Sequence, residues 1–315
     1  MTAVASTGRV ASPAFAALLV LLIATVGCSS QTNPAPRDNA APQRDTGDPV
    51  VVAAGDIADC RTEGDEATAR LVGRIDGTTV LPLGDQAYPE GTAQDYQECY
   101  EPSWGRFKER TRPVPGNHEY DTPGAEGYFD YFGKAAGDPA KGYYSFNLGD
   151  EWHLVALNSN CGEIDGCGYA SEQLRWLEAD LAANKDKSCT LAYMHHPRFS
   201  SGVKHGGTPW IEPLWEALYE GGAEVVLSGH EHNYERFAPQ NRGGREDAEL
   251  GIRQFVVGTG GRGHHPILDP IANSEVQNDE THGVLKLTLR PEGYEWRFVP
   301  VEGESFSDSG SASCH

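Results

Sequence analysis

Short apolar runs recur along this 315-residue chain from Val50 onward, and stretches with helical spacing separate several of them. Runs of about five residues that are rich in valine, leucine and aromatic residues are typical of buried strands. Because such runs alternate with helical stretches here, the pattern predicts an α/β domain. The runs that we interpret as strands are Val50 to Ala54, Thr79 to Leu83, Trp152 to Leu157, Thr190 to Met194, Val225 to Ser228, Gln254 to Gly258, Val284 to Leu289 and Tyr294 to Val299.

Helix signals mark three of the intervening stretches. Ser171 is a favoured N-cap residue, and the leucines that follow it recur at helical spacing. Thr208-Pro209 forms a second helix start, because proline suits the first helical turn. We expect a third helix from about Glu63 to Ile75, and a hairpin turn at Pro291-Glu292-Gly293 between the last two strands.

The first 27 residues have the features of a secretory signal peptide. Arg9 precedes an apolar block, Ala14 to Val26, that is too short for a comfortable membrane span. Cys28 then stands in a pattern that resembles a bacterial lipoprotein box, although Thr25 occupies a position where that motif usually carries leucine. We therefore expect an exported protein that contacts the membrane through a lipid on Cys28, with plain secretion as the alternative.

Composition divides the rest of the chain into three parts. Residues 28–48 are rich in proline, asparagine and alanine and show no periodicity, which predicts a flexible tether. The globular domain is expected over residues 49–302. Residues 303–315 are rich in serine and glycine, and we expect a loose tail there unless Cys314 pins it.

Six cysteines remain after Cys28, and an even number in an exported chain suggests disulfides. Cys161 and Cys167 bracket five residues and fit a small local loop. Six cysteines allow fifteen connectivities, so the sequence leaves the map open. One arrangement of the other four is Cys60 with Cys99 and Cys189 with Cys314. A cysteine zinc site is disfavoured because no C-x-x-C pair occurs.

The charge balance is strongly acidic, with 46 acidic and 25 basic residues and a formal net charge of −21. A protein that wraps nucleic acid needs a basic face, so we expect no such partner. The same charge would repel an anionic substrate unless bound cations reverse the local field.

Polar clusters follow several of the strand-like runs, where loops at the carboxyl ends of strands gather into a site. Their carboxylate, amide and imidazole groups are metal ligands, and their glycines let the backbone approach an ion closely. Alone, each cluster also fits an ordinary turn or a packed histidine, but five on one chain favour a metal site. The clusters are Gly55-Asp56, Gly84-Asp85-Gln86-Ala87-Tyr88, Pro115-Gly116-Asn117-His118-Glu119, Met194-His195-His196-Pro197 and Gly229-His230-Glu231-His232.

This series resembles the calcineurin-like metallophosphoesterase superfamily over about Val50 to Pro300, and within it the purple acid phosphatase branch. Most of that superfamily begins with Asp-x-His, whereas this chain has Asp56-Ile57-Ala58 and lacks the histidine. Tyr88 compensates for the missing histidine, and that exchange marks the purple branch. A phenolate is a hard anionic donor that suits trivalent iron. The resemblance implies a four-layer αββα sandwich, here as a single-domain form.

By the same resemblance, seven side chains would hold two metal ions. Asp85 would bridge the ions about 3.5–4 Å apart, the spacing of two-metal phosphatases. Tyr88 favours Fe³⁺ in the first site, and the second would take Fe²⁺, Zn²⁺ or Mn²⁺. The implied ligands are Asp56, Asp85, Tyr88 and His232 for the first metal, and Asp85, Asn117, His195 and His230 for the second.

Three further residues are expected to serve catalysis rather than bind metal. His118 follows Asn117, and the resemblance implies a general acid there or a donor to a phosphoryl oxygen. Glu119 is expected to orient His118. His205 stands ten residues after His195, near where the family places further substrate histidines.

Other histidines have less defined roles. The role of His196 stays open, because the family usually has a small residue at its position. His264 and His265 follow the glycine-rich run Gly258-Thr259-Gly260-Gly261. A surface turn explains that pair better than a place at the mouth of a site.

The sequence thus predicts an exported, binuclear metal-dependent phosphatase for small phosphorylated substrates. By the resemblance, it would hydrolyse phosphate monoesters through attack of a metal-bound hydroxide. A phosphodiesterase of the same fold is the alternative within this class, because both reactions use the same metal pair. A surface lipoprotein that binds metal or phosphate without turnover is the alternative outside it.

Overall fold

The computed structural model describes residues 47–315. The predicted signal peptide (1–27), the lipid on Cys28 and most of the tether (28–48) lie outside the described residues and stay predictions. Within the described part, none of the helices has the length and apolar character that crossing a bilayer requires.

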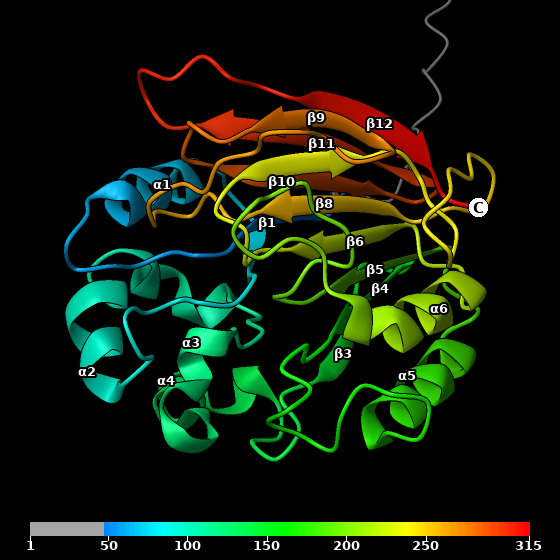
Figure 1. Cartoon of the computed structure of the whole chain (residues 1–315), viewed down its shortest axis with the longest axis horizontal. Coiled ribbons are helices and arrows are strands. Elements are labelled where there is room, and N and C mark those ends of the chain that lie inside the picture. Colours follow the sequence, from blue (N-terminus) through cyan, green and yellow to red (C-terminus); the bar gives the residue numbers. More distant parts are fainter. Residues whose placement is uncertain (1–46) are drawn as a thin grey trace, which may run out of the picture. The chain divides into compact units, whose positions relative to one another are not determined.

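Twelve strands form two mixed sheets in the described part of the chain (Figure 1). One sheet contains β1 (Val50–Ala54), β2 (Thr78–Pro82), β10 (Gly283–Arg290), β11 (Gly293–Pro300) and β12 (Ser309–Ser313), in the order β12-β11-β10-β1-β2. The other contains β3 (Tyr144–Leu148), β4 (Trp152–Ala156), β5 (Cys189–Tyr193), β6 (Val225–Ser228), β7 (Tyr234–Phe237), β8 (Arg253–Val257) and β9 (Ser274–Asn278), in the order β3-β4-β5-β6-β8-β7-β9. All eight predicted strands are confirmed, as is the hairpin between β10 and β11.

The central strands of the second sheet are buried on both faces. Along β5, Leu191 and Tyr193 join the apolar cluster between the sheets, whereas Ala192 and the following Met194 join a second cluster under the helices. Successive side chains of a strand point to opposite faces, so a continuous apolar run suits a strand that is covered on both sides.

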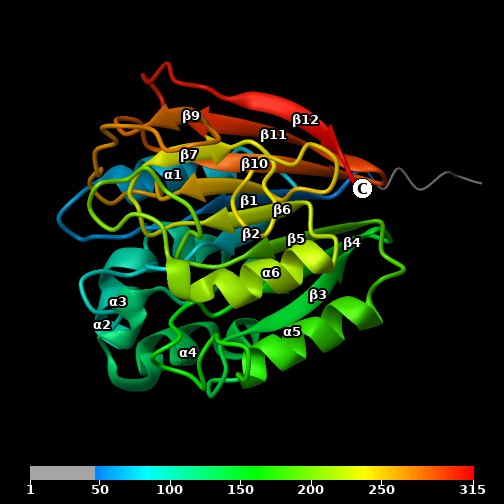
Figure 2. The ribbon, with the colours of Figure 1, turned by 45° about the vertical axis from the view of Figure 1, so that its right-hand side comes forward.

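Helices complete the outer layers. The described helices are α1 (Gly64–Gly73), α2 (Ala93–Asp95), α3 (Asn117–Tyr120), α4 (Glu126–Phe132), α5 (Glu172–Ala183) and α6 (Glu212–Glu220), with a π-helical segment at Tyr96–Tyr100 and 3-10 helices at Trp104–Arg110, Pro123–Ala125, Gly133–Ala136 and Pro209–Ile211. α1 packs against β10, and α5 and α6 lie side by side over the second sheet (Figure 2). Ser171 caps α5, since its Oγ accepts the Leu174 N–H at 3.2 Å. The result is the predicted αββα sandwich.

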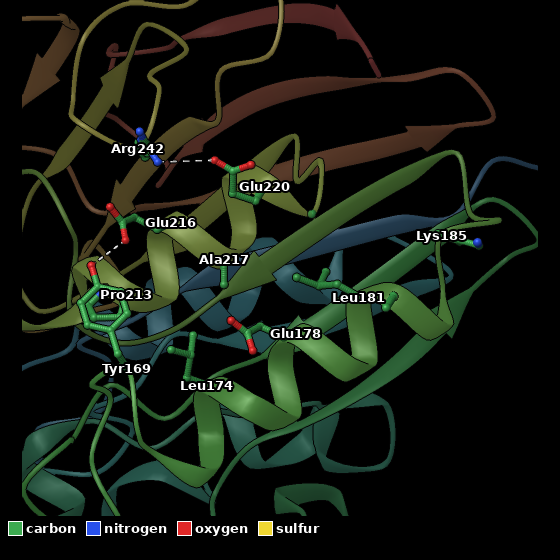
Figure 3. Close-up of a pocket in the computed structure, with 12 residues that line it drawn as sticks. Tyr169, Leu174, Glu178, Leu181, Lys185, Pro213, Glu216, Ala217, Glu220 and Arg242 are labelled. Atoms are coloured by element: carbon green, nitrogen blue, oxygen red, sulfur yellow. Dashed lines mark hydrogen bonds and ion pairs between the residues drawn. The ribbon is translucent and has the colours of Figure 1, made fainter.

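A groove of about 660 Å³ separates α5 from α6 on this outer layer (Figure 3). Leu174, Leu181 and Pro213 line it together with the exposed carboxylate of Glu178. The groove shares no residue with the ten predicted site residues.

Three disulfides connect the cysteines of the described chain: Cys60–Cys99, Cys161–Cys167 and Cys189–Cys314. The last of these bears on residues 303–315, where we expected a loose tail unless Cys314 pinned it. Cys314 does pin this segment, and β12 extends the first sheet by pairing with β11.

Candidate metal centre

The seven predicted ligands converge on one region from loops of both sheets. Parallel strands bring their carboxyl ends to the same edge, and β1 and β2 are parallel, as are β5 and β6. The ligands lie after β1 (Asp56), β2 (Asp85 and Tyr88), β5 (His195) and β6 (His230 and His232), and Asn117 is the first residue of α3.

The first group centres on the hydroxyl of Tyr88. Its Oη lies 3.1 Å from Oδ1 of Asp56, 3.0 Å from Oδ2 of Asp85 and 3.3 Å from Nε2 of His232. All four side chains are buried. Three oxygen donors and one imidazole form a hard ligand set of the kind predicted for the first metal.

The second group centres on Nε2 of His195. This atom lies 3.1 Å from Oδ1 of Asn117 and 3.1 Å from Nδ1 of His230. It also lies 3.4 Å from Oδ1 of Asp85. Nitrogen and oxygen donors therefore gather here as predicted for the second metal.

Asp85 belongs to both groups. Its Oδ2 faces Tyr88 and its Oδ1 faces His195, so one carboxylate spans the two ligand sets. The ligand atoms of Asp56, Asp85 and His195 all lie within 4.8 Å of one another. This arrangement has the form required of a bridging carboxylate between two ions.

Backbone carbonyls orient two of the imidazoles. The Nδ1–H of His195 donates to the carbonyl of Leu83 at 2.8 Å, and the Nδ1–H of His232 donates to the carbonyl of Gly263 at 2.7 Å. Each ring therefore presents Nε2 to the cluster. Hydrogen bonds of this kind fix the tautomer and raise the basicity of a ligand.

The backbone is specialised at these loops. Asp56, Asp85 and His230 adopt positive φ angles of 59°, 49° and 72°, a backbone conformation that residues other than glycine seldom adopt. A Cβ at Gly84 would lie 2.4 Å from Nδ1 of His195, and a Cβ at Gly116 would lie 2.1 Å from Oδ1 of Asp85. The glycines thus permit the close approach that the sequence predicted.

Two buried carboxylates set the electrostatics of the cluster. Burial, and then the charges of Asp85 and Asp56, raise the pKa of Tyr88 well above that of a free phenol. Burial opposes a charge on His195, but the Asp85 and Asp56 carboxylates and the Leu83 carbonyl together outweigh it and raise the pKa of His195 to about 9. Both carboxylate effects favour positive charge at the cluster, so this donor set fits multivalent cations.

His118 lies beside the ligands without joining either group. Its Nδ1–H donates to the carbonyl of Pro89 at 2.6 Å, and its Nε2 is 3.9 Å from Oδ2 of Asp85. The ring packs on Tyr88 with the centroids 4.6 Å apart, and 34% of the side chain is exposed. The imidazole is therefore accessible to a ligand, and its role as a proton donor stays a prediction.

Glu119 differs from its prediction. We expected this carboxylate to orient His118, but the His118 ring is held by the carbonyl of Pro89 instead. The buried Glu119 accepts backbone N–H groups from Asp85 at 2.8 Å, Gly116 at 2.7 Å and Gln86 at 2.9 Å. It therefore ties the loop of Asp85 to the loop that begins α3, and it is a positioning residue.

The other histidines surround the ligand histidines. The ring of His205 lies 4.2 Å from that of His230, which places it beside the predicted second site. The ring of His196 lies 4.3 Å from His230, and its Nδ1 is 2.8 Å from Oγ of Ser159. Burial, together with the neighbouring charge of His195, lowers the pKa of His196 to about 3, so this ring is neutral.

The surface-turn interpretation was wrong for His265. Its buried ring stacks on His232 at a centroid distance of 3.7 Å. Sequence reasoning also missed Arg262, whose guanidinium lies 4.6 Å from the centre of the Tyr88 ring. Its backbone N–H donates to the carbonyl of Asp56 at 2.9 Å. The only local signal for both residues was the glycine-rich run that precedes them.

Comparison with known proteins agrees with this geometry. The chain matches the family model for calcineurin-like phosphoesterases over residues 45–234. It is 32% identical to purple acid phosphatase 15 of Arabidopsis thaliana over 219 residues, which cover 58% of this chain and 40% of that protein. It is 28% identical to the uncharacterized protein Rv2577 of Mycobacterium tuberculosis over 265 residues, which cover 68% of this chain and 49% of that protein. The chain thus spans half the length, or less, of these relatives.

Solved structures show the same fold at lower identity. A purple acid phosphatase from yellow lupin seeds matches with a TM-score of 0.68 and 20% identity, over 84% of this chain and 53% of that one. GAP50, the anchor in the inner membrane complex of Plasmodium, matches with a TM-score of 0.67 and 13% identity, over 85% of this chain and 90% of that one. Likeness at this level of identity concerns the fold alone.

Proposed function

This chain belongs to the calcineurin-like phosphoesterase family and is similar within it to purple acid phosphatases, and from that premise we propose that it is a binuclear metal-dependent phosphatase for phosphate monoesters. We also propose that it works outside the cytoplasm. Three disulfides support this location, because such bonds persist in oxidising compartments. A lipid on Cys28 would then hold the domain at the membrane.

The position of Tyr88 carries the proposal. Its hydroxyl lies between the carboxylates of Asp56 and Asp85, where a phenolate would be a ligand. A hard anionic oxygen favours Fe³⁺ in the first site. Asn117, His195 and the other second-site ligands offer nitrogen and oxygen donors that suit Fe²⁺, Zn²⁺ or Mn²⁺.

Bound ions would supply Lewis acidity for the phosphoryl oxygens and an activated water as the nucleophile. The protein's own contribution would be a proton for the leaving group. His118 is suited to this role because its Nδ1–H is held by Pro89 while 34% of the side chain stays exposed. His205 lies beside His230 and would donate to a phosphoryl oxygen.

The proposal is tested by comparing the rates at which the protein hydrolyses phenyl phosphate, a monoester, and diphenyl phosphate, a diester. The protein is first loaded with metal, and its metal content is measured. We expect the monoester to be hydrolysed, Asp85→Asn to abolish turnover, and His118→Ala to lower kcat about 10²- to 10⁴-fold. Glu178→Gln, in the groove between α5 and α6, is a control for removal of an exposed carboxylate. Turnover of the diester alone would move the function to a phosphodiesterase with the same ligands.

A metal-binding protein without turnover is the second candidate. The same fold occurs in GAP50, a protein that is named as an anchor in a membrane complex and not as an enzyme. His118 argues against this candidate, because a protein that only holds metals needs no accessible imidazole beside Asn117. Protein that carries two metals but hydrolyses neither ester would favour it.

A further inference from the structure

A cleft of about 340 Å³ opens beside the candidate metal centre. The end of α3 forms one wall, and the segment that enters the Cys161–Cys167 disulfide forms the other. The cleft is lined by Asn117, Tyr120, Asp121, Ser159, Asn160, Cys161, Gly162, Glu163, His196 and Trp210. One of the predicted ligands, Asn117, is therefore shared between the cleft and the metal centre.

Two contacts connect the cleft with the reacting groups. The ring of His196 lies 4.3 Å from His230 and 6.2 Å from Trp210, so it joins the second metal group to the cleft. Asp121 lies 3.3 Å from Nδ1 of His118, the predicted proton donor. Asn117 and His196 thus line the cleft and also border the second metal group, so a leaving group that departs from that group would enter this cleft.

We propose that the cleft receives the leaving group of the ester and selects flat groups that are neutral or positively charged. The inference rests on the proposed phosphatase function and specifies its substrate class. Trp210 is 57% exposed and offers an aromatic face. Asp121 and Glu163 carry negative charge, and none of the ten lining residues is lysine or arginine. Esters with a second anionic group would therefore be poor substrates.

The walls of the cleft are also positioned before a ligand binds. The amide of Asn158 donates to the hydroxyl of Tyr120 at 2.8 Å, and among residues 47–315 no group accepts the proton of that hydroxyl. Tyr120 can therefore donate to a polar substituent of the leaving group. On the opposite wall, the side chain of Asn160 donates to the carbonyl of Pro115 at 3.1 Å. Preorganised walls lower the entropic cost of binding.

The test compares kcat/KM ratios in the metal-loaded full chain. For Glu163→Gln we expect the ratio of 4-carboxyphenyl phosphate to phenyl phosphate to rise about 3- to 10-fold, because one repelling charge is removed. For Trp210→Ala we expect the ratio of phenyl phosphate to glycerol 2-phosphate to fall about 3- to 10-fold, because the aromatic contact is lost. Glu178→Gln removes an exposed carboxylate outside the cleft and should leave both ratios unchanged.

The outcomes separate this inference from the function on which it rests. Wild-type turnover with unchanged ratios in both cleft variants would overturn the leaving-group assignment and leave the phosphatase proposal intact. The same shift in Glu178→Gln would show a general charge effect and would also overturn the assignment. Failure of the metal-loaded wild type to hydrolyse any ester would overturn the phosphatase proposal and the assignment together.

Discussion

Replacing Glu119 by glutamine would test whether one buried carboxylate holds two ligand-bearing loops together. Oε2 of Glu119 accepts the N–H groups of Asp85 and Gly116, and Oε1 accepts the N–H of Gln86. The single carbonyl oxygen of glutamine can retain the first two bonds, but its NH₂ group then faces the N–H of Gln86. Burial and the neighbouring Asp85 charge raise the pKa of Glu119 to about 7, so neutralising the carboxylate itself costs little near that pH. Leaving a buried N–H without its acceptor should still cost about 1–3 kcal/mol.

Metal affinity should fall in the same variant. Asp85 belongs to both ligand groups, so a shift of its loop would weaken both sites. Loss of a supporting hydrogen bond around a ligand typically costs about 10- to 100-fold in metal affinity. Glu119→Ala removes the acceptor of four backbone N–H groups and of the Tyr96 hydroxyl, and should lower stability further, by about 3–6 kcal/mol in total.

Urea unfolding of the metal-free protein would measure the stability change, and chelator competition would measure metal affinity. Glu178→Gln serves as the matched control, because its carboxylate is exposed on α5. Wild-type metal affinity in Glu119→Gln, together with a stability loss below about 1 kcal/mol, would refute the positioning role.

Three further variants probe other parts of the molecule. Tyr88→Phe should lose first-site iron and the visible absorption of an iron–phenolate bond, and an unchanged spectrum would exclude Tyr88 as a ligand. Burial raises the pKa of Glu224 from 4.5 to about 8, so the folded state binds the extra proton and stability falls as pH rises through that window. Glu224→Gln should therefore stabilise the protein by about 1–4 kcal/mol near pH 9 and little near pH 4, and equal urea midpoint shifts at both pH values would contradict this. A disulfide restricts the unfolded chain more when it closes a longer loop. Loss of Cys189–Cys314, with a sequence separation of 125, should therefore cost about 5 kcal/mol of stability, and loss of Cys161–Cys167, with a separation of 6, about 2 kcal/mol. A lower melting temperature for the variant without Cys161–Cys167 would contradict this.

Apolar patterning predicted eight of the twelve described strands and missed β3, β7, β9 and β12, three of which lie at sheet edges. β12 has the sequence Ser-Gly-Ser-Ala-Ser, which has no hydrophobic pattern at all. Pairing with β11 and the disulfide at Cys314 hold it in place. Where tertiary pairing rather than side-chain burial makes a strand, local sequence carries little signal. β3, by contrast, alternates apolar and polar residues as Tyr-Ser-Phe-Asn-Leu, so its sequence carried a strand signal that our prediction missed.

The candidate site shows a similar division. The predicted ligands were accessible to sequence reasoning because each stands in a short motif after a strand or at the start of a helix. Glu119 belongs to such a motif, yet its partner at Asp85 is 34 residues away, so its role depended on the fold. The stacking of His265 on His232 likewise joins separate loops, which spacing alone does not reveal.

The origin of the ligands in both sheets has a consequence for maturation. Asp56 and Asp85 extend from the first sheet, whereas His195 and His230 extend from the second. Ions bound by both sets would act as a cross-link across the interface between the sheets. The last stage of compaction would then depend on the metal supply where the protein folds. Amide exchange in β1 and β6 would consequently report metal loading before any substrate is added.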